Sequence, residues 1–491
     1  MGRSDGGPAG EGPEPTEESP GVSRRSFLRA SVLGGSFVAV PGLLSACSSS
    51  KKTAAAPSST APAPSASSSG AAPSSAAASG STAASGGPVG ANDTLRALFP
   101  MGKNDGAGMK FTNGMLLAMT GTGAFYGRVM SRGAQLAAKQ IAAMGGPTFD
   151  IQIADHQSGN VQAGVTGTRR LIQQNKIETL QTSYGAVTVA IIPLIQSGKV
   201  MTLNGGGPDP SQVGKDWLYM TRMFAGDDQA AGGCAWLAQT FPSAIRLAVV
   251  GTTENATESQ TQIIPTMWPK LGGGRTVVVQ DTTESGATSY AQTVARVQAA
   301  KADAVFTFNT GNDHGYLLKD LRDGGFKGPV LGIEYSTDAA KIAGAAYDTY
   351  FFTADFFDVG SQNPFAKQFV EAHTAEYGVA PELYGANYYE EVFMIWTLIR
   401  NALAAGADPH QSSSLLAAMN AGPKFLSVYG GSAAGPGQLV INADHTTVKP
   451  QGVYQVTASG PVLLESTQKI DLAADPKTAL LKKVADPAPT G

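Results

Sequence analysis

Short runs of apolar, β-branched residues alternate along the chain with segments whose apolar residues recur at helical spacing. The apolar runs predict strands over residues 115–119, 150–154, 200–203, 247–250, 275–279, 304–308 and 329–333. Between these runs, apolar residues three or four positions apart predict helices, as over residues 134–141, 294–300 and 317–321. Strands that alternate with helices in this way form right-handed βαβ units, so the pattern predicts an α/β fold with parallel sheets.

The predicted βαβ units are too many for a single sheet of ordinary size. The region after residue 92 is long enough for two domains at ~100–200 residues per domain. We therefore expect two doubly wound parallel-sheet lobes. Because ligands of such sheets bind beyond the carboxyl ends of the strands, the residues that follow each strand are the candidates for a binding site.

The first 47 residues have the pattern of an export signal. Arg24 and Arg25 precede an apolar run over residues 30–46 that is too short and too interrupted to span a membrane. The arginine pair resembles a twin-arginine signal, which exports folded proteins. Leu44-Ser-Ala-Cys47 resembles the lipobox of bacterial lipoproteins, which implies cleavage before Cys47, acylation of its sulfur, and anchoring of the mature protein to the lipid bilayer outside the cytoplasm.

Residues 48–92 differ in composition from the rest of the chain. From residue 53 to residue 91 almost every residue is Ser, Thr, Ala, Pro or Gly. Such a segment lacks the apolar side chains that would offset the entropy of ordering it. The composition predicts a disordered linker between the membrane anchor and the folded lobes.

Charge and residue counts exclude several classes of function. The 35 Lys and Arg against 38 Asp and Glu give a net charge of -3, which disfavours nucleic acid as a partner. The five histidines are scattered, without a His-Glu-x-x-His pattern, and no pair of cysteines has metal-ligand spacing. No Gly-x-Ser-x-Gly motif stands at a strand end, so a hydrolase is not predicted. We expect no metal, no cofactor and no catalytic residue, and we expect Cys234 to be a buried thiol.

The segment after the first predicted strand resembles a known family. It reads Thr-Gly-Thr-Gly-Ala-Phe-Tyr-Gly over residues 120–127, and it leads into a helix that contains Gly133 and ends at Gly145-Gly146. This order resembles the opening of the periplasmic binding proteins of ABC importers, of the branched-chain amino acid type. Further matches follow in the family's order at Asp155-His156, Arg170, Arg222 with Asp227, Asp303, Glu334 and Tyr388.

The resemblance implies a type I periplasmic binding protein fold, in which two lobes joined by a multi-segment hinge close on a ligand. The boundaries that it implies are 93–226 and 351–428 for the first lobe, 227–350 and 429–476 for the second lobe, and 477–491 for a C-terminal tail. The implied function is an extracytoplasmic, lipid-anchored receptor. It captures a small-molecule ligand and hands it to the membrane subunits of an ABC permease, without chemistry of its own.

Candidate ligand contacts in the first lobe follow its strands. Tyr126 takes the place of the first-loop aromatic that the family turns toward the ligand. Ser183, Tyr184 and Gly185 precede a helix, whose first N–H groups suit a carboxylate or another acceptor. Gly207, in a Gly-Gly-Gly-Pro loop, allows a ligand to approach the backbone closely.

Candidate residues of the second lobe include an acid. Glu334 directly follows a predicted strand, and the resemblance implies that it holds the ammonium group of an amino acid. An ammonium group enclosed in a cleft needs such a partner because an unpaired buried charge is costly. Thr310 is a candidate polar contact, and Asp227 is placed to organise the hinge more than to touch ligand.

The chain departs from the family pattern at several contact positions. The hydroxyls expected after the third and fourth strands fall on Gly185 and Pro208, and the aromatic residues expected in the second lobe fall near Ala256 and Thr310. These departures favour a wider, more polar cleft, in which Asn255, Asn309 and Thr310 are the candidate polar contacts. The ligand class therefore stays open among amino acids, short peptides, amides and other small polar solutes.

Two further functions remain as alternatives. The same fold would also serve a ligand sensor that signals to a membrane partner other than a permease. Gly121-x-Gly-x-x-x-Gly127 is also a relaxed dinucleotide-binding pattern, which would make the protein an exported enzyme. The aromatic pair Phe125-Tyr126 counts against that alternative, because it would crowd a loop that must approach pyrophosphate.

Overall fold

The computed structural model describes residues 90, 92–222, 226–253, 255–447, 449, 451–458 and 460–466, and it leaves out a few side chains inside helices and strands. The export signal with Arg24 and Arg25, the acylation site Cys47 and the C-terminal tail lie outside these residues, as does nearly all of the linker. Among the described residues, no helix is long and apolar enough to cross a membrane.

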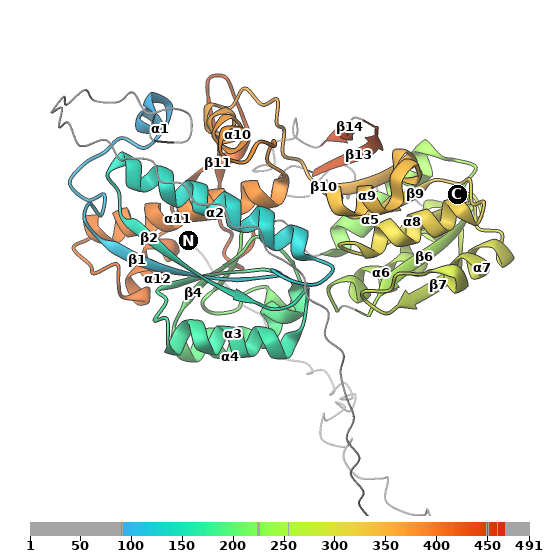
Figure 1. Ribbon diagram of the computed structural model, residues 1–491, viewed down its shortest axis with the longest axis horizontal. Coiled ribbons are helices and arrows are strands. Elements are labelled where there is room, and N and C mark those ends of the chain that lie inside the picture. The colour runs from blue at the N-terminus through green and yellow to red at the C-terminus, as the bar shows by residue number, and fades with distance from the viewer. Residues whose placement is uncertain are drawn as a thin grey trace, which may run out of the picture. The chain divides into compact units, whose positions relative to one another are not determined.

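The first lobe is a five-stranded parallel sheet with helices on both faces (Figure 1). Its strands are β1 (Lys110–Leu117), β2 (Thr148–Asp155), β3 (Thr179–Thr182), β4 (Met201–Asn204) and β5 (Leu218–Met220), in the spatial order β2-β1-β3-β4-β5. Its helices are α1 (Asp93–Leu98), α2 (Ala124–Met144), α3 (Val161–Gln173), α4 (Gly185–Gly198), α10 (Pro364–Tyr377), α11 (Leu383–Ala404) and α12 (Ser412–Asn420). In Figure 1, α2 and α11 cover one face of the sheet, and α3 and α4 cover the other.

The second lobe is built on a seven-stranded sheet in the order β14-β13-β10-β9-β8-β6-β7. Its strands are β6 (Arg246–Thr252), β7 (Thr276–Thr283), β8 (Ala304–Thr307), β9 (Val330–Gly332), β10 (Tyr350–Asp355), β13 (Gln451–Thr457) and β14 (Gly460–Ser466). Its helices are α5 (Gly226–Thr240), α6 (Asn255–Met267), α7 (Ala291–Ala299), α8 (Asp313–Asp323) and α9 (Thr337–Ala343). The described residues also form three short 3-10 helices: η1 (Pro210–Gln212), η2 (Pro269–Leu271) and η3 (Gly344–Thr349).

The predicted α/β architecture of two doubly wound lobes is confirmed, and the second sheet adds a feature that the pattern did not indicate. Strands β6 to β10 run parallel, but β13 pairs antiparallel with β10, and β14 pairs antiparallel with β13. β13 and β14 follow one another directly and form a hairpin. Because a hairpin needs no crossover helix, its strands pair in the antiparallel sense. Because β10 belongs to this sheet, the second lobe runs past the boundary expected at residue 350. The hairpin of β11 (Phe425–Ser432) and β12 (Gly435–Leu439) packs in the first lobe's core, which therefore runs past residue 428.

Each sheet separates two apolar cores. One core of the first lobe lies between the sheet and α2, α10 and α11, and the other lies under α3 and α4. In the second lobe, α7, α8 and α9 cover one face, and α5 and α6 cover the other. Cys234 of α5 is fully buried in the latter core, and burial raises the pKa of its thiol, as expected for a structural cysteine.

Three crossover segments, after β5, β10 and β12, connect the lobes and meet in one buried polar cluster. Arg222 from the first crossover forms an ion pair with Asp355 at the end of β10, with Nε 2.8 Å from Oδ2. Gln451, the first residue of β13 after the third crossover, donates to the other oxygen of the same carboxylate at 3.1 Å. Lys449, from the third crossover, lies 3.1 Å from Glu390 of α11. Because breaking a buried ion pair leaves an uncompensated charge, these contacts fix the paths of the crossovers.

Candidate ligand-binding site

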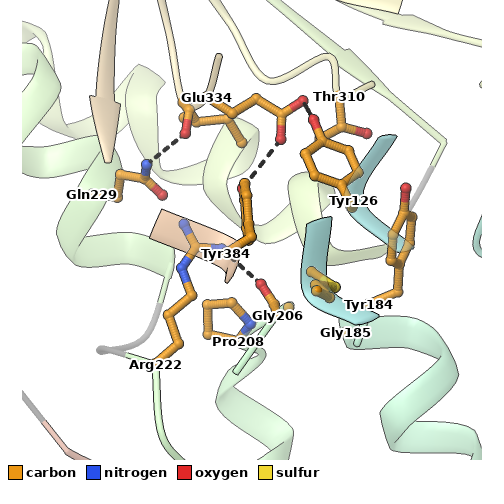
Figure 2. Close-up of a pocket in the computed structure, with 13 residues that line it drawn as sticks. Tyr126, Tyr184, Gly185, Gly206, Pro208, Arg222, Gln229, Thr310, Glu334 and Tyr384 are labelled. Atoms are coloured by element: carbon orange, nitrogen blue, oxygen red, sulfur yellow. Dashed lines mark hydrogen bonds between the residues drawn. The ribbon is translucent and has the colours of Figure 1, made fainter. Parts of the chain in front are cut away.

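A cavity lies where strands of both lobes end, and it encloses about 630 Å³ of space when its solvent-open part is included (Figure 2). The first lobe and its crossover line the cavity with Tyr126, Met130, Tyr184, Gly185, Gly206, Gly207, Pro208, Arg222 and Tyr384. The second lobe lines it with Gln229, Thr310, Ile333 and Glu334.

The wall after β3 and β4 is mostly main chain. Tyr184 precedes α4 with a φ of 65°, a left-handed conformation that is uncommon for a non-glycine residue, and Gly185 opens the helix. Gly207 touches this turn so closely that a Cβ at Gly207 would lie 2.6 Å from the Cα of Tyr184 and would also collide with the nitrogen of Gly185. Only glycine allows this packing, which brings the loop after β4 against the start of α4.

Asn204 at the end of β4 holds the glycine loop in shape. Its side-chain oxygen accepts from the backbone N–H of Gly206 at 3.1 Å and from that of Gly207 at 3.3 Å. Its amide nitrogen donates to the carbonyl of Gly207 at 2.9 Å and to Gln212 at 2.7 Å. A buried polar side chain with all these partners makes this part of the wall rigid.

Tyr126 enters the cavity from the first turn of α2. A Cβ at Gly127 would collide with the carbonyl of Ala118, and a Cβ at Gly133 would collide with the carbonyl of Gly385 in α11. The glycines of the sequence motif therefore let α2 pack directly against backbone on both sides. This packing sets the position of Tyr126, whose ring lies edge-on to that of Tyr384 with the centroids 4.9 Å apart.

Glu334 reaches the cavity from the turn after β9, and donors from both lobes contact its carboxylate (Figure 2). The hydroxyl of Tyr126 donates to Oε1, and the backbone N–H of Gly311 donates to the same oxygen at 2.6 Å. The hydroxyl of Tyr384 lies 3.5 Å from Oε2. Burial raises the pKa of the Tyr126 hydroxyl well above its usual value, and the negative charge of Glu334 nearby raises it further. This group therefore keeps its proton and acts as a donor.

Arg222 joins the cavity to the crossovers. Its Nη1 donates to the carbonyl of Gly206 at 2.6 Å, and its guanidinium lies over the ring of Tyr384, 4.9 Å from the centroid. Burial acts to lower the pKa of Arg222, but the Asp355 carboxylate outweighs burial and raises it, so the guanidinium stays charged. The glycine loop is thus tied to the same ion pair that holds the crossovers.

Most of the sequence-predicted ligand contacts come together at this cavity. Its lining includes Tyr126, Tyr184, Gly185, Gly207, Thr310 and Glu334. Ser183 is fully buried behind the wall instead, where its hydroxyl lies 3.0 Å from Nε2 of His156. Burial lowers the pKa of His156 to about 4, so this histidine is a neutral structural partner. Asp227 lies in α5, and its side chain is outside the described residues.

Tyr384 and Gln229 line the cavity although the sequence did not single them out, and Asn309, a predicted polar contact, does not line it. The resemblance pointed to Tyr388, which is buried with its hydroxyl on the carbonyl of Thr182, whereas Tyr384, one helical turn earlier, lines the cavity. Gln229 lines the cavity and donates to the carbonyl of Ile333 at 3.0 Å. The amide of Asn309 donates to the hydroxyl of Tyr290 inside the second lobe, at 3.0 Å.

Comparisons with known proteins agree with this fold. A family model described as periplasmic binding protein matches residues 111–461. The structure of a leucine binding protein from Thermotoga maritima is similar with a TM-score of 0.62 at 20% identity, over 72% of this chain and 98% of that one. A solute binding protein from R. palustris in complex with benzoate has a TM-score of 0.63 at 20% identity, over 73% and 96% of the two chains. A branched-chain amino acid transporter substrate binding protein from Streptococcus pneumoniae, in complex with isoleucine, has a TM-score of 0.61 at 20% identity, over 73% and 98%. No curated protein matches the chain significantly.

Proposed function

Because the chain belongs to the periplasmic binding protein family, we propose that it is the substrate-binding protein of an ABC importer and captures an amino acid or a similar small polar solute. The observation that carries this proposal is the cavity between strand ends of both lobes, lined by Glu334 on one side and by the start of α4 on the other. Two lobes that contribute opposite walls of one cavity suit capture by hinge closure. Release to a permease would then follow from reopening.

The two walls suit the two ends of a zwitterion. The carboxylate of Glu334 is a partner for an ammonium group, and it is 4% exposed, so an ion pair there is only weakly screened. On the opposite wall, Gly185 opens α4 and Gly207 adjoins it. The backbone N–H groups at a helix start, together with the helix dipole, favour a carboxylate. We propose that the ligand spans the cavity in this orientation.

The sharpest test of this proposal replaces the acid. Glu334→Gln keeps the size of the side chain and removes its charge, so affinity for an ammonium-bearing ligand should fall by about 1–3 kcal/mol. Titration calorimetry would measure this after a thermal-shift screen of amino acids, amides, short peptides and benzoate has identified ligands that raise the melting temperature. The matched control is Glu376→Gln, which removes an exposed acid that pairs with Lys139. If both variants bind alike, Glu334 does not hold the ligand.

We also propose that acylation of Cys47 anchors the protein to the outer face of the membrane. The support is the order of residues in the sequence: an arginine pair, an apolar run and a lipobox-like Leu-Ser-Ala-Cys. Cys47→Ala should leave the exported protein in the soluble fraction, as judged by membrane fractionation of cells. A variant that still sediments with membranes would contradict this anchor.

A further inference from the structure

A histidine supports Glu334 from the buried side of the wall. His314 lies in the first turn of α8, is fully buried, and does not line the cavity. Its Nδ1 lies 3.5 Å from Oε1 of Glu334, and this nitrogen has no hydrogen-bond partner among the described residues. Its Nε2 lies 2.6 Å from the hydroxyl oxygen of Tyr347. The imidazole therefore bridges η3 and the candidate ligand-binding acid.

The hydrogen-bond network assigns the tautomer of His314. The hydroxyl oxygen of Tyr347 accepts from the backbone N–H of Ser336 at 3.4 Å. Among the described residues, Nε2 of His314 is the acceptor within reach of the Tyr347 hydroxyl proton, so this proton is donated to Nε2. Nδ1 then carries the ring proton 3.5 Å from Oε1 of Glu334, a separation at which it attracts the carboxylate but which is longer than an ordinary hydrogen bond. In the opposite tautomer a lone pair of Nδ1 would face the carboxylate, and the two would repel each other.

The surroundings of His314 keep it neutral. Burial lowers the pKa of His314 to about 3. Its ring is stacked with those of Tyr347 and Tyr350, with centroids 5.7 and 5.6 Å away. The hydroxyl of Tyr350 donates to the backbone carbonyl of Glu334 at 3.0 Å, and burial raises the pKa of both tyrosines well above the usual value. The groups that face the imidazole from η3, β10 and the turn after β9 are thus two protonated tyrosines and the acid.

We propose that His314 is a positioning residue that, as its neutral Nδ1–H tautomer, holds the carboxylate of Glu334 in the orientation that binds the ligand's cationic group. This inference rests on the proposed role of Glu334 in binding. A glutamate side chain has several rotatable bonds, and a ligand that had to order it would lose affinity for that reason. A donor fixed behind the acid removes part of this loss before the ligand arrives.

The first experiment is a double-mutant cycle with L-leucine as the probe ligand. His314→Phe keeps an aromatic ring for the tyrosine stack and removes the donor, and His314→Asn keeps an N–H near the position of Nδ1. We expect His314→Phe to weaken binding by about tenfold, equivalent to ~1.4 kcal/mol, and His314→Asn to stay within about threefold of the native chain. In a Glu334→Gln background, His314→Phe should change affinity by less than about twofold. An equal loss in both backgrounds would overturn the proposal, because the histidine would then act independently of Glu334.

The second experiment needs no ligand and separates this inference from the proposed function. Nitrogen-15 NMR of the full-length chain labelled at histidine, with His314→Asn to assign the signals, reports which imidazole nitrogen carries the proton. We expect a neutral ring protonated at Nδ1 between pH 5.5 and 8. A ring protonated at Nε2 would overturn the positioning role. If the native chain binds no ammonium-bearing ligand but shows the Nδ1–H signal, the proposed function fails while the buried histidine–glutamate contact stands.

Discussion

The two lobes present different groups to the cavity: main chain at the start of α4 and the loop after β4 in the first lobe, and a carboxylate side chain in the second. The part of the first-lobe wall after β3 and β4 presents backbone from Gly185, Gly206 and Gly207, and Arg222 beside it donates to the carbonyl of Gly206. The second-lobe wall presents the side chain of Glu334, which lies against His314. A wall of main chain is shaped by where glycine lets the chain approach itself, whereas a wall of side chains depends on buried partners that fix their rotamers. The first kind of wall tolerates little change in volume, and the second tolerates little change in hydrogen bonding.

The largest effect should come from removing the charge that ties the first-lobe wall to the crossovers. Arg222→Met leaves Asp355 buried without its cation and the carbonyl of Gly206 without a donor, so the free energy of unfolding should fall by about 3–5 kcal/mol. Denaturant unfolding would measure this loss. Arg246→Met is the matched control, because Arg246 forms an exposed ion pair with Asp303 and should contribute less than about 1 kcal/mol. Equal losses in the two variants would show that the buried cluster does not stabilise the wall.

A single methyl group in the first wall should have the next largest effect. Gly207→Ala places a Cβ against backbone atoms of Tyr184 and Gly185, which cannot move without displacing the start of α4. We expect a loss of about 1–3 kcal/mol in the free energy of unfolding, with weaker ligand binding in the same variant. Gly435→Ala is the control, because a Cβ there meets nothing within 4 Å and should change stability by less than ~0.5 kcal/mol. If Gly207→Ala leaves the free energy of unfolding unchanged, the loop after β4 is not packed tightly against the turn before α4.

The smallest effect should come from an exposed ion pair that links the two lobes. Arg128 of α2 and Asp338 of α9 approach to 2.9 Å, with side chains 42% and 30% exposed. Arg128→Gln should reduce ligand affinity by no more than about fivefold, equivalent to ~1 kcal/mol, and the reduction should shrink at high salt. Lys139→Gln is the control, because Lys139 pairs with Glu376 inside the first lobe and its loss should leave affinity unchanged. A loss for Arg128→Gln that does not shrink with salt would point to a packing role for this side chain.

Much of the fold and part of the site could be predicted because both follow from local patterns. The apolar runs located strands, and strand ends located Gly207 and Glu334, since ligands of parallel sheets bind beyond those ends. The family resemblance pointed to Tyr126, which also lines the cavity. The resemblance to the periplasmic binding proteins is confirmed by the family match over residues 111–461. The antiparallel pairing of β13 and β14 was missed, because antiparallel edge strands join by tertiary pairing that a local pattern does not contain.

Which of the candidate side chains reach the cavity depends on directions that sequence alone does not fix. Ser183 and Tyr184 are neighbours, yet Ser183 turns inward to His156 while Tyr184 faces the cavity, because the left-handed turn at Tyr184 sends the two side chains apart. Tyr384 and Tyr388 lie one turn apart on α11, and the start of that helix relative to the sheet decides which of them reaches the cavity. The available signal was a tyrosine one turn before Tyr388, in the helix that resembles the family's.

The buried thiol of Cys234 gives the second lobe an intrinsic chemical reporter. The sequence has two cysteines, so a chain carrying Cys47→Ala keeps this thiol as its single sulfhydryl. Alkylating reagents attack the exposed thiolate, and burial both shields the sulfur and raises its pKa. Modification would then proceed only during moments when α5 separates from its sheet. The rate of that modification, compared with and without a bound solute, would show how far capture suppresses local opening of α5, with no dye and no engineered label.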